Sequence, residues 1–386
     1  MKIIGVKVLE FRRRLDGRSW NPAFRWHERR APLLILETDS GLSGVGEAWS
    51  QQPRIAFVLD YLARRCAPAL LGRDPLLRMP ISSQLESVSA GATEPWVAAA
   101  AESAIDIALW DLAAQAAGQP LWRALGGSTG RAAVYASGGL YRDGSSVKDL
   151  AHEFEADVEQ GFMAVKMKLG ALPLEADLER TRTVRDAVGD EVTLWVDAVN
   201  QLTRASAPAW CAALARVGVA AVQAPLPFDD ISGMADINAS LLPVIATEAE
   251  HREEVFRALV EANAVTYLQY CVGLCGGFSG AMRIDALAAT HAVNSTPQCF
   301  STAVLQAASL HLGAARENVI AVEFHRFHDH LAAALPAAMR NVEAGFVHLD
   351  DAPGLGVPPP TLGEQPGGGE VRLHRHVALH DHASNS

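Results

Sequence analysis

The most regular pattern in this chain runs from residue 131 to about residue 325, where short apolar runs alternate with amphipathic runs. Short apolar runs predict buried strands, and they occupy residues 132–137, 162–169, 192–199, 220–225, 244–247, 265–271, 292–297 and 319–324. The amphipathic runs predict helices at residues 149–160, 175–188, 207–217, 252–261, 279–291 and 302–315. Strands that alternate with crossover helices form parallel sheets, so this region predicts a (β/α)8 barrel.

The region before the barrel follows other patterns. Strand-like runs at residues 2–11, 33–38 and 43–47 predict a small antiparallel sheet. Residues 54–125 are mostly helical in pattern and include an Ala-rich stretch that ends at Gly118.

The region after the barrel is poor in regular patterns. Beyond Phe346 the chain is rich in Pro and Gly, and we expect it to return to the N-terminal sheet. The tail from Gly367 contains four histidines: His374, His376, His380 and His382. Such a tract could bind a metal, but its composition favours a disordered tail.

Composition excludes some classes of function. The chain has 386 residues and a formal net charge of −11, which argues against nucleic acid as a partner. Its five cysteines have no paired spacing, which favours a reducing compartment, so we expect a cytoplasmic protein. No signal peptide or membrane-spanning run is visible in the sequence.

The strand predicted at residues 162–169 contains two lysines, Lys166 and Lys168. Successive strand residues point to opposite faces, so these two side chains share one face. Burial and a nearby like charge both lower the pKa of a lysine, and such a lysine can act as a base near neutral pH. The alternative is a surface strand with two solvated lysines.

In a barrel of this type the functional groups gather at the carboxyl ends of the strands. The candidates at these ends are Lys166, Lys168, Asp197, Gln223, Glu248, Cys271, Gln298 and Glu323. A further candidate is the segment 16–30, which is rich in Arg and aromatic residues and includes Arg25 and Arg29. This segment could close over an anionic ligand, or it could be an ordinary exposed loop.

Several motifs spread over nearly the whole chain form a recognisable set. They are Thr38-Asp39-Ser40-Gly41-Leu42 with Gly44-Val45-Gly46-Glu47, Ala104-Ile105-Asp106-Ile107-Ala108-Leu109-Trp110-Asp111-Leu112 with Gly118-Gln119-Pro120-Leu121, Lys166-Met167-Lys168, Gly276-Gly277-Phe278-Ser279-Gly280 and Pro353-Gly354-Leu355-Gly356. The set resembles the mandelate racemase/muconate lactonizing enzyme group of the enolase superfamily. This resemblance implies an α/β fold in which a (β/α)7β TIM-like barrel, residues 129–345, carries an α+β capping domain. The capping domain would be formed by residues 1–128 and by the C-terminal segment 346–386.

The resemblance also implies a chemistry. Members of this group abstract the proton α to a carboxylate and stabilise the resulting enolate on Mg²⁺. By position, Lys168 would be the base that faces the substrate α-carbon, and Lys166 would help to hold the substrate carboxylate and lower the pKa of its neighbour. Because the enolate is a dianion, a divalent cation held by carboxylate oxygens would offset its charge.

The three metal-ligand positions of the group match this chain only in part. Asp197 matches the first position. Gln223 stands at the second, where the group has Glu, and it keeps an oxygen donor but lacks the charge. Glu248 falls on the third position, with Glu250 as the alternative. With two negative charges in place of three, we expect Mg²⁺ to bind weakly or not at all.

The positions opposite the lysines also depart from the group. Cys271 and Gln298 stand where one branch has an Asp–His dyad, and Gln298 cannot accept and hold a proton, so two-base racemisation is not expected. Glu323 lies where the group often has a carboxylate near the substrate, although a structural salt bridge explains it equally well. Cys271, Cys275 and Cys299 could form a soft-metal site, but inert buried thiols are the usual outcome.

Two functions fit these residues. The first is an enolase-superfamily lyase of the acid-sugar or hydroxy-acid dehydratase type, with Lys168 as the base. In this function Arg25, Gln298 and Glu323 would contact the substrate. The second is a carboxylate-binding barrel with lost or altered catalysis, because Gln223, Cys271 and Gln298 replace the group's residues.

The partners expected from the sequence follow from these two functions. A pure scaffold would not explain charged groups gathered at one end of the strands. We therefore expect a small-molecule carboxylate as the substrate and neither nucleic acid nor a membrane as a partner. The resemblance also implies a homo-oligomer.

Overall fold

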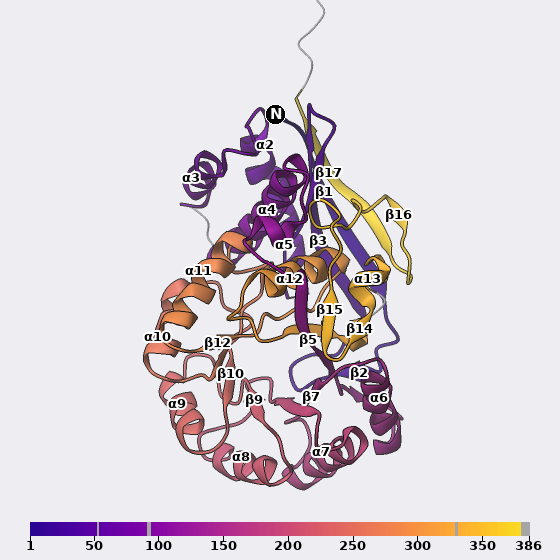
Figure 1. The fold of residues 1–386 in the computed structure, drawn as a ribbon, viewed down its shortest axis with the longest axis vertical. Helices are drawn as coiled ribbons and strands as arrows, with labels where there is room; N and C mark the ends of the chain where they lie inside the picture. The colour runs from indigo at the N-terminus through magenta and orange to yellow at the C-terminus, as the bar shows by residue number, and fades with distance from the viewer. Residues whose placement is uncertain (52–53, 91–93, 329–330, 380–386) are drawn as a thin grey trace, which may run out of the picture.

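The computed structural model describes residues 1–51, 54–90, 94–328 and 331–379. Figure 1 shows two parts: a twisted sheet with helices beside it, and a ring of short strands enclosed by helices. Among the described residues, no helix combines the length and the apolar character needed to cross a membrane.

The ring is a barrel of parallel strands. Within the described residues its strands are β5 (Arg131–Gly138), β7 (Ala164–Lys168), β8 (Thr193–Asp197), β9 (Ala221–Gln223), β10 (Val244–Ala246), β11 (Tyr267–Leu268), β12 (Asn294–Ser295) and β13 (Val322–His325). They pair in parallel in the order β12-β11-β10-β9-β8-β7-β5, and β13 pairs in parallel with β5. The last seam is linked by backbone hydrogen bonds from Ile320 to Ser295 (3.0 Å) and from Glu323 to Pro297 (3.1 Å).

A helix follows each of the first seven strands in the described part of the barrel. These helices are α6 (Val147–Glu159), α7 (Leu174–Val188), α8 (Ala207–Arg216), α9 (Ile231–Ser240), α10 (Glu253–Glu261), α11 (Gly277–Thr290) and α12 (Ala303–Ala315). The architecture is therefore the (β/α)7β TIM-like barrel that the resemblance implied. Helix α9 was not among the helices predicted from the pattern, since it is short and contains Gly233; the side chain of Asp230 caps it by accepting from the Gly233 N–H.

The lower interior of the barrel is filled by aromatic side chains. Tyr135, Trp195 and Tyr267 lie in contact, with ring centroids 4.9 and 5.6 Å apart along the row. Small residues such as Ala221 pack between them. Large and small side chains of alternate strands together fill the centre of a barrel. These rings therefore fill the barrel below the polar groups at the strand ends.

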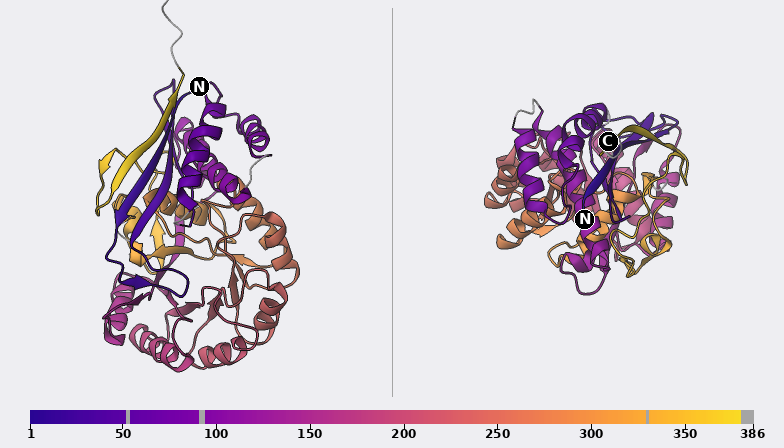
Figure 2. Two further views of the ribbon diagram at one scale, coloured as in Figure 1. Left: turned by 180° about the vertical axis from the view of Figure 1, so that it is seen from behind. Right: turned by 90° about the horizontal axis from the view of Figure 1, so that it is seen from above.

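The capping domain contains an antiparallel sheet with the order β16-β17-β1-β3-β4. Its strands are β1 (Ile3–Arg14), β3 (Glu28–Thr38), β4 (Ser43–Glu47), β16 (Gly363–Glu364) and β17 (Glu370–Ala378). Both Figures 1 and 2 show β17, from the C-terminal segment, beside β1. The N- and C-terminal segments thus build one sheet.

The prediction of a disordered tail from Gly367 is wrong for residues 370–378. These residues form β17 because the free edge of β1 offers an unpaired row of backbone groups, and the two strands pair along most of their length. His374 Nε2 lies 3.1 Å from Asp60, and His376 Nε2 lies 3.1 Å from Glu37. His380 and His382 lie outside the described residues.

The chain between the barrel and β17 takes an indirect route. It contains the turn η3 (Arg326–His328), α13 (Ala337–Arg340), β14 (Val342–Glu343) and β15 (Phe346–His348). Strand β15 pairs antiparallel with β5, so the chain just after residue 345 still contacts the barrel sheet before it returns to the cap. The domain boundaries at residues 128 and 345 stay predictions.

The helices of the cap pack on the sheet through unusually close contacts. The helices of the cap are α1 (Ile55–Tyr61), the π-helical turn η2 (Leu62–Cys66), α2 (Ala67–Leu70), α3 (Arg78–Ser89), α4 (Pro95–Ala116) and α5 (Leu121–Ala124). A Cβ atom on Gly46 would lie 1.8 Å from the carbonyl oxygen of Ala104, and one on Gly44 would lie 2.3 Å from that of Ala108. The Gly-Val-Gly motif is therefore needed for the contact between β4 and α4.

Three carboxylates, of which Glu47 and Asp111 are buried and Asp106 is partly buried, join the cap to the barrel and to the C-terminal segment. Glu47 accepts from the N–H groups of Thr302 (3.1 Å) and Leu305 (2.9 Å) at the start of α12. On α4, Asp106 accepts a hydrogen bond from the Ser279 N–H (2.9 Å), and Asp111 accepts one from the Leu355 N–H (2.8 Å). Burial raises the pKa of Asp106 and of Asp111 to about 6. These bonds satisfy helix and loop N–H groups that would otherwise be buried without partners.

Candidate functional site

The two lysines of β7 point into the barrel from the same face of the strand. Lys168 Nζ lies 2.5 Å from Asp197 Oδ2, and Lys166 Nζ lies 3.9 Å from the same oxygen. Lys166 is completely buried and also contacts Glu323 Oε1 at 2.8 Å. The alternative of two solvated surface lysines is therefore wrong.

Gln223 at the end of β9 connects this ion-pair network to Glu248. Its Oε1 accepts from Lys166 Nζ at 2.6 Å, and its Nε2 donates to Glu248 Oε2 at 2.7 Å. Glu323 at the other side of Lys166 also accepts from the Cys299 N–H at 3.1 Å. Six of the eight predicted strand-end groups thus belong to one connected cluster: Lys166, Lys168, Asp197, Gln223, Glu248 and Glu323.

The network sets the charge states of its members. Burial disfavours the charged form of Lys166, but the carboxylates of Glu323, Asp197 and Glu248 outweigh burial and raise its pKa. The sequence-based expectation of a lowered lysine pKa is therefore wrong for Lys166. For Glu323 burial is outweighed in the same way by Lys166 and Lys168, which lower its pKa. Burial, reinforced by the charge of Asp197, raises the pKa of Glu248 to about 7.

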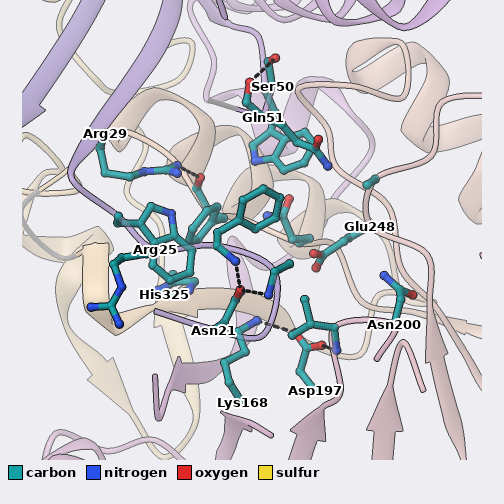
Figure 3. Close-up of a pocket in the computed structure, with 18 of the residues that line it drawn as sticks. Asn21, Arg25, Arg29, Ser50, Gln51, Lys168, Asp197, Asn200, Glu248 and His325 are labelled. Carbon is teal, nitrogen blue, oxygen red and sulfur yellow. Dashed lines mark hydrogen bonds and ion pairs between the residues drawn. The ribbon is translucent and has the colours of Figure 1, made fainter. Parts of the chain in front are cut away.

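A cavity of about 470 Å³ opens above this cluster. Figure 3 shows Lys168, Asp197 and Glu248 directed into it from the barrel, while Asn21, Arg25 and Arg29 come from the N-terminal segment. The cavity is lined by Asn21, Ala23, Phe24, Arg25, Trp26, His27, Glu28, Arg29, Trp49, Ser50, Gln51, Lys168, Asp197, Val199, Asn200, Gln201, Phe228, Glu248, Ala249, Gln298, Phe300, Glu323 and His325. Its size suits a small organic ligand. Of the two lysines, Lys168 lines the cavity and Lys166 lies behind it.

The Arg-rich segment 16–30 does cover the mouth of the barrel. A short ribbon of β2 (Ser19–Trp20) and β6 (Tyr141–Arg142) holds it there, and the rings of Trp20 and Tyr141 stack at 4.7 Å. Arg25 lines the cavity, but its guanidinium group points away from Lys168 and bonds to Asp143 Oδ2 at 2.6 Å. A substrate contact of Arg25 stays a prediction.

Arg29 is buried in the same wall of the cavity. Its Nη2 donates to the Phe300 carbonyl at 2.9 Å, and burial lowers its pKa to about 9 although Glu47 acts against this. Its Nε has no hydrogen-bond partner among the residues that the structure describes. Arg29 therefore places a cation with a spare donor beside the cavity.

The two positions opposite the lysines differ in their access to the cavity. Gln298 lines it, and its Oε1 has no partner within the described part of the chain. Cys271 is completely buried next to Gln298 and does not line the cavity. Burial also raises the pKa of the thiols of Cys275 and Cys299, and no group of three His, Cys, Asp or Glu side chains in the described ranges is placed to hold a metal ion. The soft-metal hypothesis is therefore wrong, and the thiols are structural.

Glu248 and Glu250 lie in different surroundings. Glu248 faces the cavity, whereas Glu250 turns back to accept from the N–H groups of His251 and Arg252 and pairs with the Arg252 guanidinium at 2.7 Å. Glu250 is thus occupied in its own loop.

The side chains present do not fit a magnesium ion held by Asp197, Gln223 and Glu248. Mg²⁺ needs an oxygen lone pair from each ligand. Gln223 turns its N–H toward Glu248 and its one oxygen toward Lys166, so its side chain presents no free oxygen between Asp197 and Glu248. The loss of one carboxylate, noted from the sequence, therefore changes the geometry of the site as well as its charge.

Some cavity residues were not predicted as catalytic, metal-binding or substrate-binding residues. His325 follows Glu323 by two positions on β13, so strand alternation alone places it on the same face. Asn200 and Trp49 each present a buried polar atom without a partner among the described residues, Asn200 Oδ1 and Trp49 Nε1. The position of Asn200, just beyond a strand end, is a sequence signal for a site residue. Trp49 gives no such signal, because it lies far from the barrel strands in the sequence and meets the site only in the folded protein.

Comparisons with known proteins agree with this fold. Residues 23–126 match the model of the mandelate racemase/muconate lactonizing enzyme N-terminal domain, and residues 149–360 match that of the enolase C-terminal domain-like family. The chain is similar to D-galactarolactone cycloisomerase of Agrobacterium fabrum, with 31% identity over 369 residues that cover 92% of this chain and 96% of that protein. It is also similar to L-talarate/galactarate dehydratase of Salmonella typhimurium, with 32% identity over 292 residues, or 73% of this chain and 70% of that protein.

A solved structure extends the comparison to three dimensions. A racemase of Streptomyces coelicolor with bound magnesium superposes with a TM-score of 0.83 at 27% identity, over 92% of this chain and 97% of that one. The fold, the arrangement of motifs and the sequence similarity agree over most of the chain. This chain belongs to the mandelate racemase/muconate lactonizing enzyme family of the enolase superfamily.

Proposed function

We propose that this protein is a lyase of the acid-sugar or hydroxy-acid dehydratase type, in which Lys168 takes the proton α to the substrate carboxylate. The observation that carries the proposal is the position of Lys168, whose ammonium group lines the cavity together with Asp197, Glu248 and Glu323. The similarity to a sugar-acid dehydratase and a sugar-lactone cycloisomerase supports this class of reaction.

Lys168 must be a neutral amine before it can accept a proton. Asp197 Oδ2, 2.5 Å from Nζ, is placed to take the proton of the ammonium form. A short contact between an amine and a carboxylate in a buried site allows such a transfer with little movement. Asp197 is therefore the proton acceptor nearest to the base.

The negative charge that develops on the substrate needs a nearby cation. Lys166 remains charged because carboxylates surround it and raise its pKa, and it lies directly behind Asp197 and Gln223. A fixed positive charge in a buried site stabilises an enolate more than it would in water.

The departing β-hydroxyl group needs a proton donor. Glu323 is not suited to this role, because Lys166 and Lys168 lower its pKa and keep it ionised. His325, on the same face of β13, lines the cavity, and its imidazolium form can give one proton to the leaving hydroxyl group and become a neutral imidazole. We therefore assign the proton donation to His325 and the acceptance of a substrate hydroxyl to Glu323.

Proton exchange in ²H₂O tests this function. Wild type should remove the α-proton of one member of a panel of acid sugars and hydroxy-acids. ¹H NMR should show loss of the α-proton signal, with deuterium at the α-carbon of returned substrate or next to the carbonyl group of the dehydrated product. Lys168→Met should slow the exchange about 100- to 10,000-fold, the usual contribution of a general base. The control Lys148→Met, at an exposed position of α6, should exchange at the wild-type rate. Equal exchange by wild type and Lys168→Met would rule out this role of Lys168.

A second function, a carboxylate-binding barrel without turnover, is favoured by one observation. The Lys168 ammonium group is paired with Asp197 at 2.5 Å, and in that state it binds anions but accepts no proton. Binding of a panel member without any loss of its α-proton signal would favour this function. A His325→Asn variant that exchanges the α-proton but no longer releases water would favour the dehydratase.

A further inference from the structure

The orientation of the Gln223 side chain is fixed from both sides. The Lys166 ammonium group has three N–H donors and no acceptor, and it lies 2.6 Å from Gln223 Oε1. On the other side Gln223 Nε2 lies 2.7 Å from Glu248 Oε2, which can only accept while Glu248 is ionised. A flipped amide would turn N–H groups toward the ammonium group and a carbonyl toward the carboxylate, so both contacts would become repulsive.

A glutamate at this position would behave differently. Its two oxygens are equivalent, so one could accept from Lys166 while the other presented a lone pair toward Asp197 and Glu248. Glutamine has one oxygen, and Lys166 uses it. The change from Glu to Gln therefore replaces a potential ligand by a donor at the point between Asp197 and Glu248.

The two ammonium groups pair with two of the three carboxylates without a divalent cation. The ammonium groups of Lys166 and Lys168 face the carboxylates of Asp197 and Glu323 at 2.5–2.8 Å in their nearest pairs. Glu248 is engaged by the Gln223 amide. Each charged group in this buried cluster therefore has a partner of its own, as buried charges require.

We propose that this barrel binds its carboxylate ligand without a divalent cation, with Lys166, held through Gln223, as the fixed positive charge of the site. The proposal rests on the proposed function only in that the ligand is a carboxylate. In this arrangement Lys166 stays positively charged, whereas Lys168 accepts the α-proton of the substrate at the cavity. Gln223 is a positioning residue, because it holds Lys166 and Glu248 and does not line the cavity.

Metal titration tests the proposal without any need for turnover. Protein stripped with EDTA is titrated with Mn²⁺, and free Mn²⁺ is followed by electron paramagnetic resonance. Wild type should show no saturable site at millimolar Mn²⁺. Gln223→Glu should gain one site, with a Kd at least about tenfold lower than any weak wild-type binding. The matched control Gln298→Glu adds a carboxylate elsewhere on the cavity and should gain none.

The outcomes separate the parts of the proposal. Saturable one-site Mn²⁺ binding by wild type would overturn it. Failure of a folded Gln223→Glu variant to bind Mn²⁺, with folding checked by circular dichroism, would overturn the role given to Gln223. If that variant does not fold, the wild-type titration alone decides.

Calorimetry with galactarate as the probe supplies a second measurement. The affinity of wild type for galactarate should be the same in Mg²⁺ as in EDTA. A severalfold higher affinity for galactarate in Mg²⁺ would contradict the proposal. An absence of α-proton exchange would refute the proposed function but leave the titrations unaffected, so the two failures are distinguishable.

Discussion

Replacement of Lys166 by methionine tests the energetic claim that underlies the site. Lys166→Met keeps the length of the side chain but removes the charge, and it leaves Glu323 and the oxygen of Gln223 buried without their donor at 2.8 and 2.6 Å. Removal of one partner of a buried ion pair costs about 3–5 kcal/mol of unfolding free energy. We expect a loss of this size, measured by urea unfolding with circular dichroism and tryptophan fluorescence as coincident probes.

A double-variant cycle separates the ion pair from general damage. Glu323→Gln alone should also destabilise the protein, but Lys166→Met combined with Glu323→Gln removes both charges. The combined loss should therefore be smaller than the sum of the two single losses by about 2–3 kcal/mol. Lys7→Met is the matched control, because Lys7 pairs with Glu37 at 2.6 Å but is about a third exposed, and its loss should stay below about 1 kcal/mol.

The pH dependence follows from the directions of the two pKa shifts. The lowered pKa of Glu323 means that its contribution to stability is present above the pKa of an unfolded Glu, about 4.3, and is lost as the pH falls through its folded value. The raised pKa of Lys166 means that its contribution is present below about 10.4 and is lost at higher pH. The deficit of Lys166→Met should therefore be largest between roughly pH 5 and pH 10. A deficit no larger than that of Lys7→Met, or strict additivity in the cycle, would refute the reasoning.

Three further predictions concern the rest of the fold. Gly46→Ala should lower the unfolding free energy by about 3 kcal/mol or more, because the new Cβ would lie 1.8 Å from the Ala104 carbonyl oxygen, and an unchanged urea midpoint would contradict this. His311 accepts from the Trp122 N–H with Nδ1, and burial lowers its pKa to about 4; wild type should therefore lose up to about 3 kcal/mol of stability as the pH falls from 6.5 to 4, whereas His311→Gln should lose less over that range. All five cysteines are buried, so an aromatic disulfide reagent should modify the native protein only on the time scale of unfolding; rapid modification of even one thiol would be inconsistent with the packing.

Much of the barrel could be predicted from the sequence because its signals are local. Alternation along one strand places Lys166 and Lys168 on a common face, and the rule that function lies at the carboxyl ends of strands selects Asp197, Gln223 and Glu248. The contacts among these residues depend on the distances between strands, which a sequence does not contain. The direction of the Lys166 pKa shift is wrong in the sequence-based reasoning for this reason, since the surrounding carboxylates outweigh burial.

Other features depend on partners that lie far apart in the chain. Arg25 is bonded to Asp143, which follows it by 118 residues. The tail residues 370–378 form a strand only because β1 lies beside them, and their own composition predicts none. In both cases a partner outside any local window decides the conformation, so periodicity and composition are insufficient.

The cavity described above draws its two sides from different stretches of chain. The reacting groups stand on barrel strands, whereas Asn21, Arg29 and Trp49 belong to the cap. Mutations that remodel the cap side can therefore change which molecule is accepted while the proton-handling side stays intact. Substitutions in the cap segment can therefore change substrate specificity during evolution while the catalytic residues of the barrel stay the same. A directed library confined to residues 21–29 and 49–51 would use the same separation.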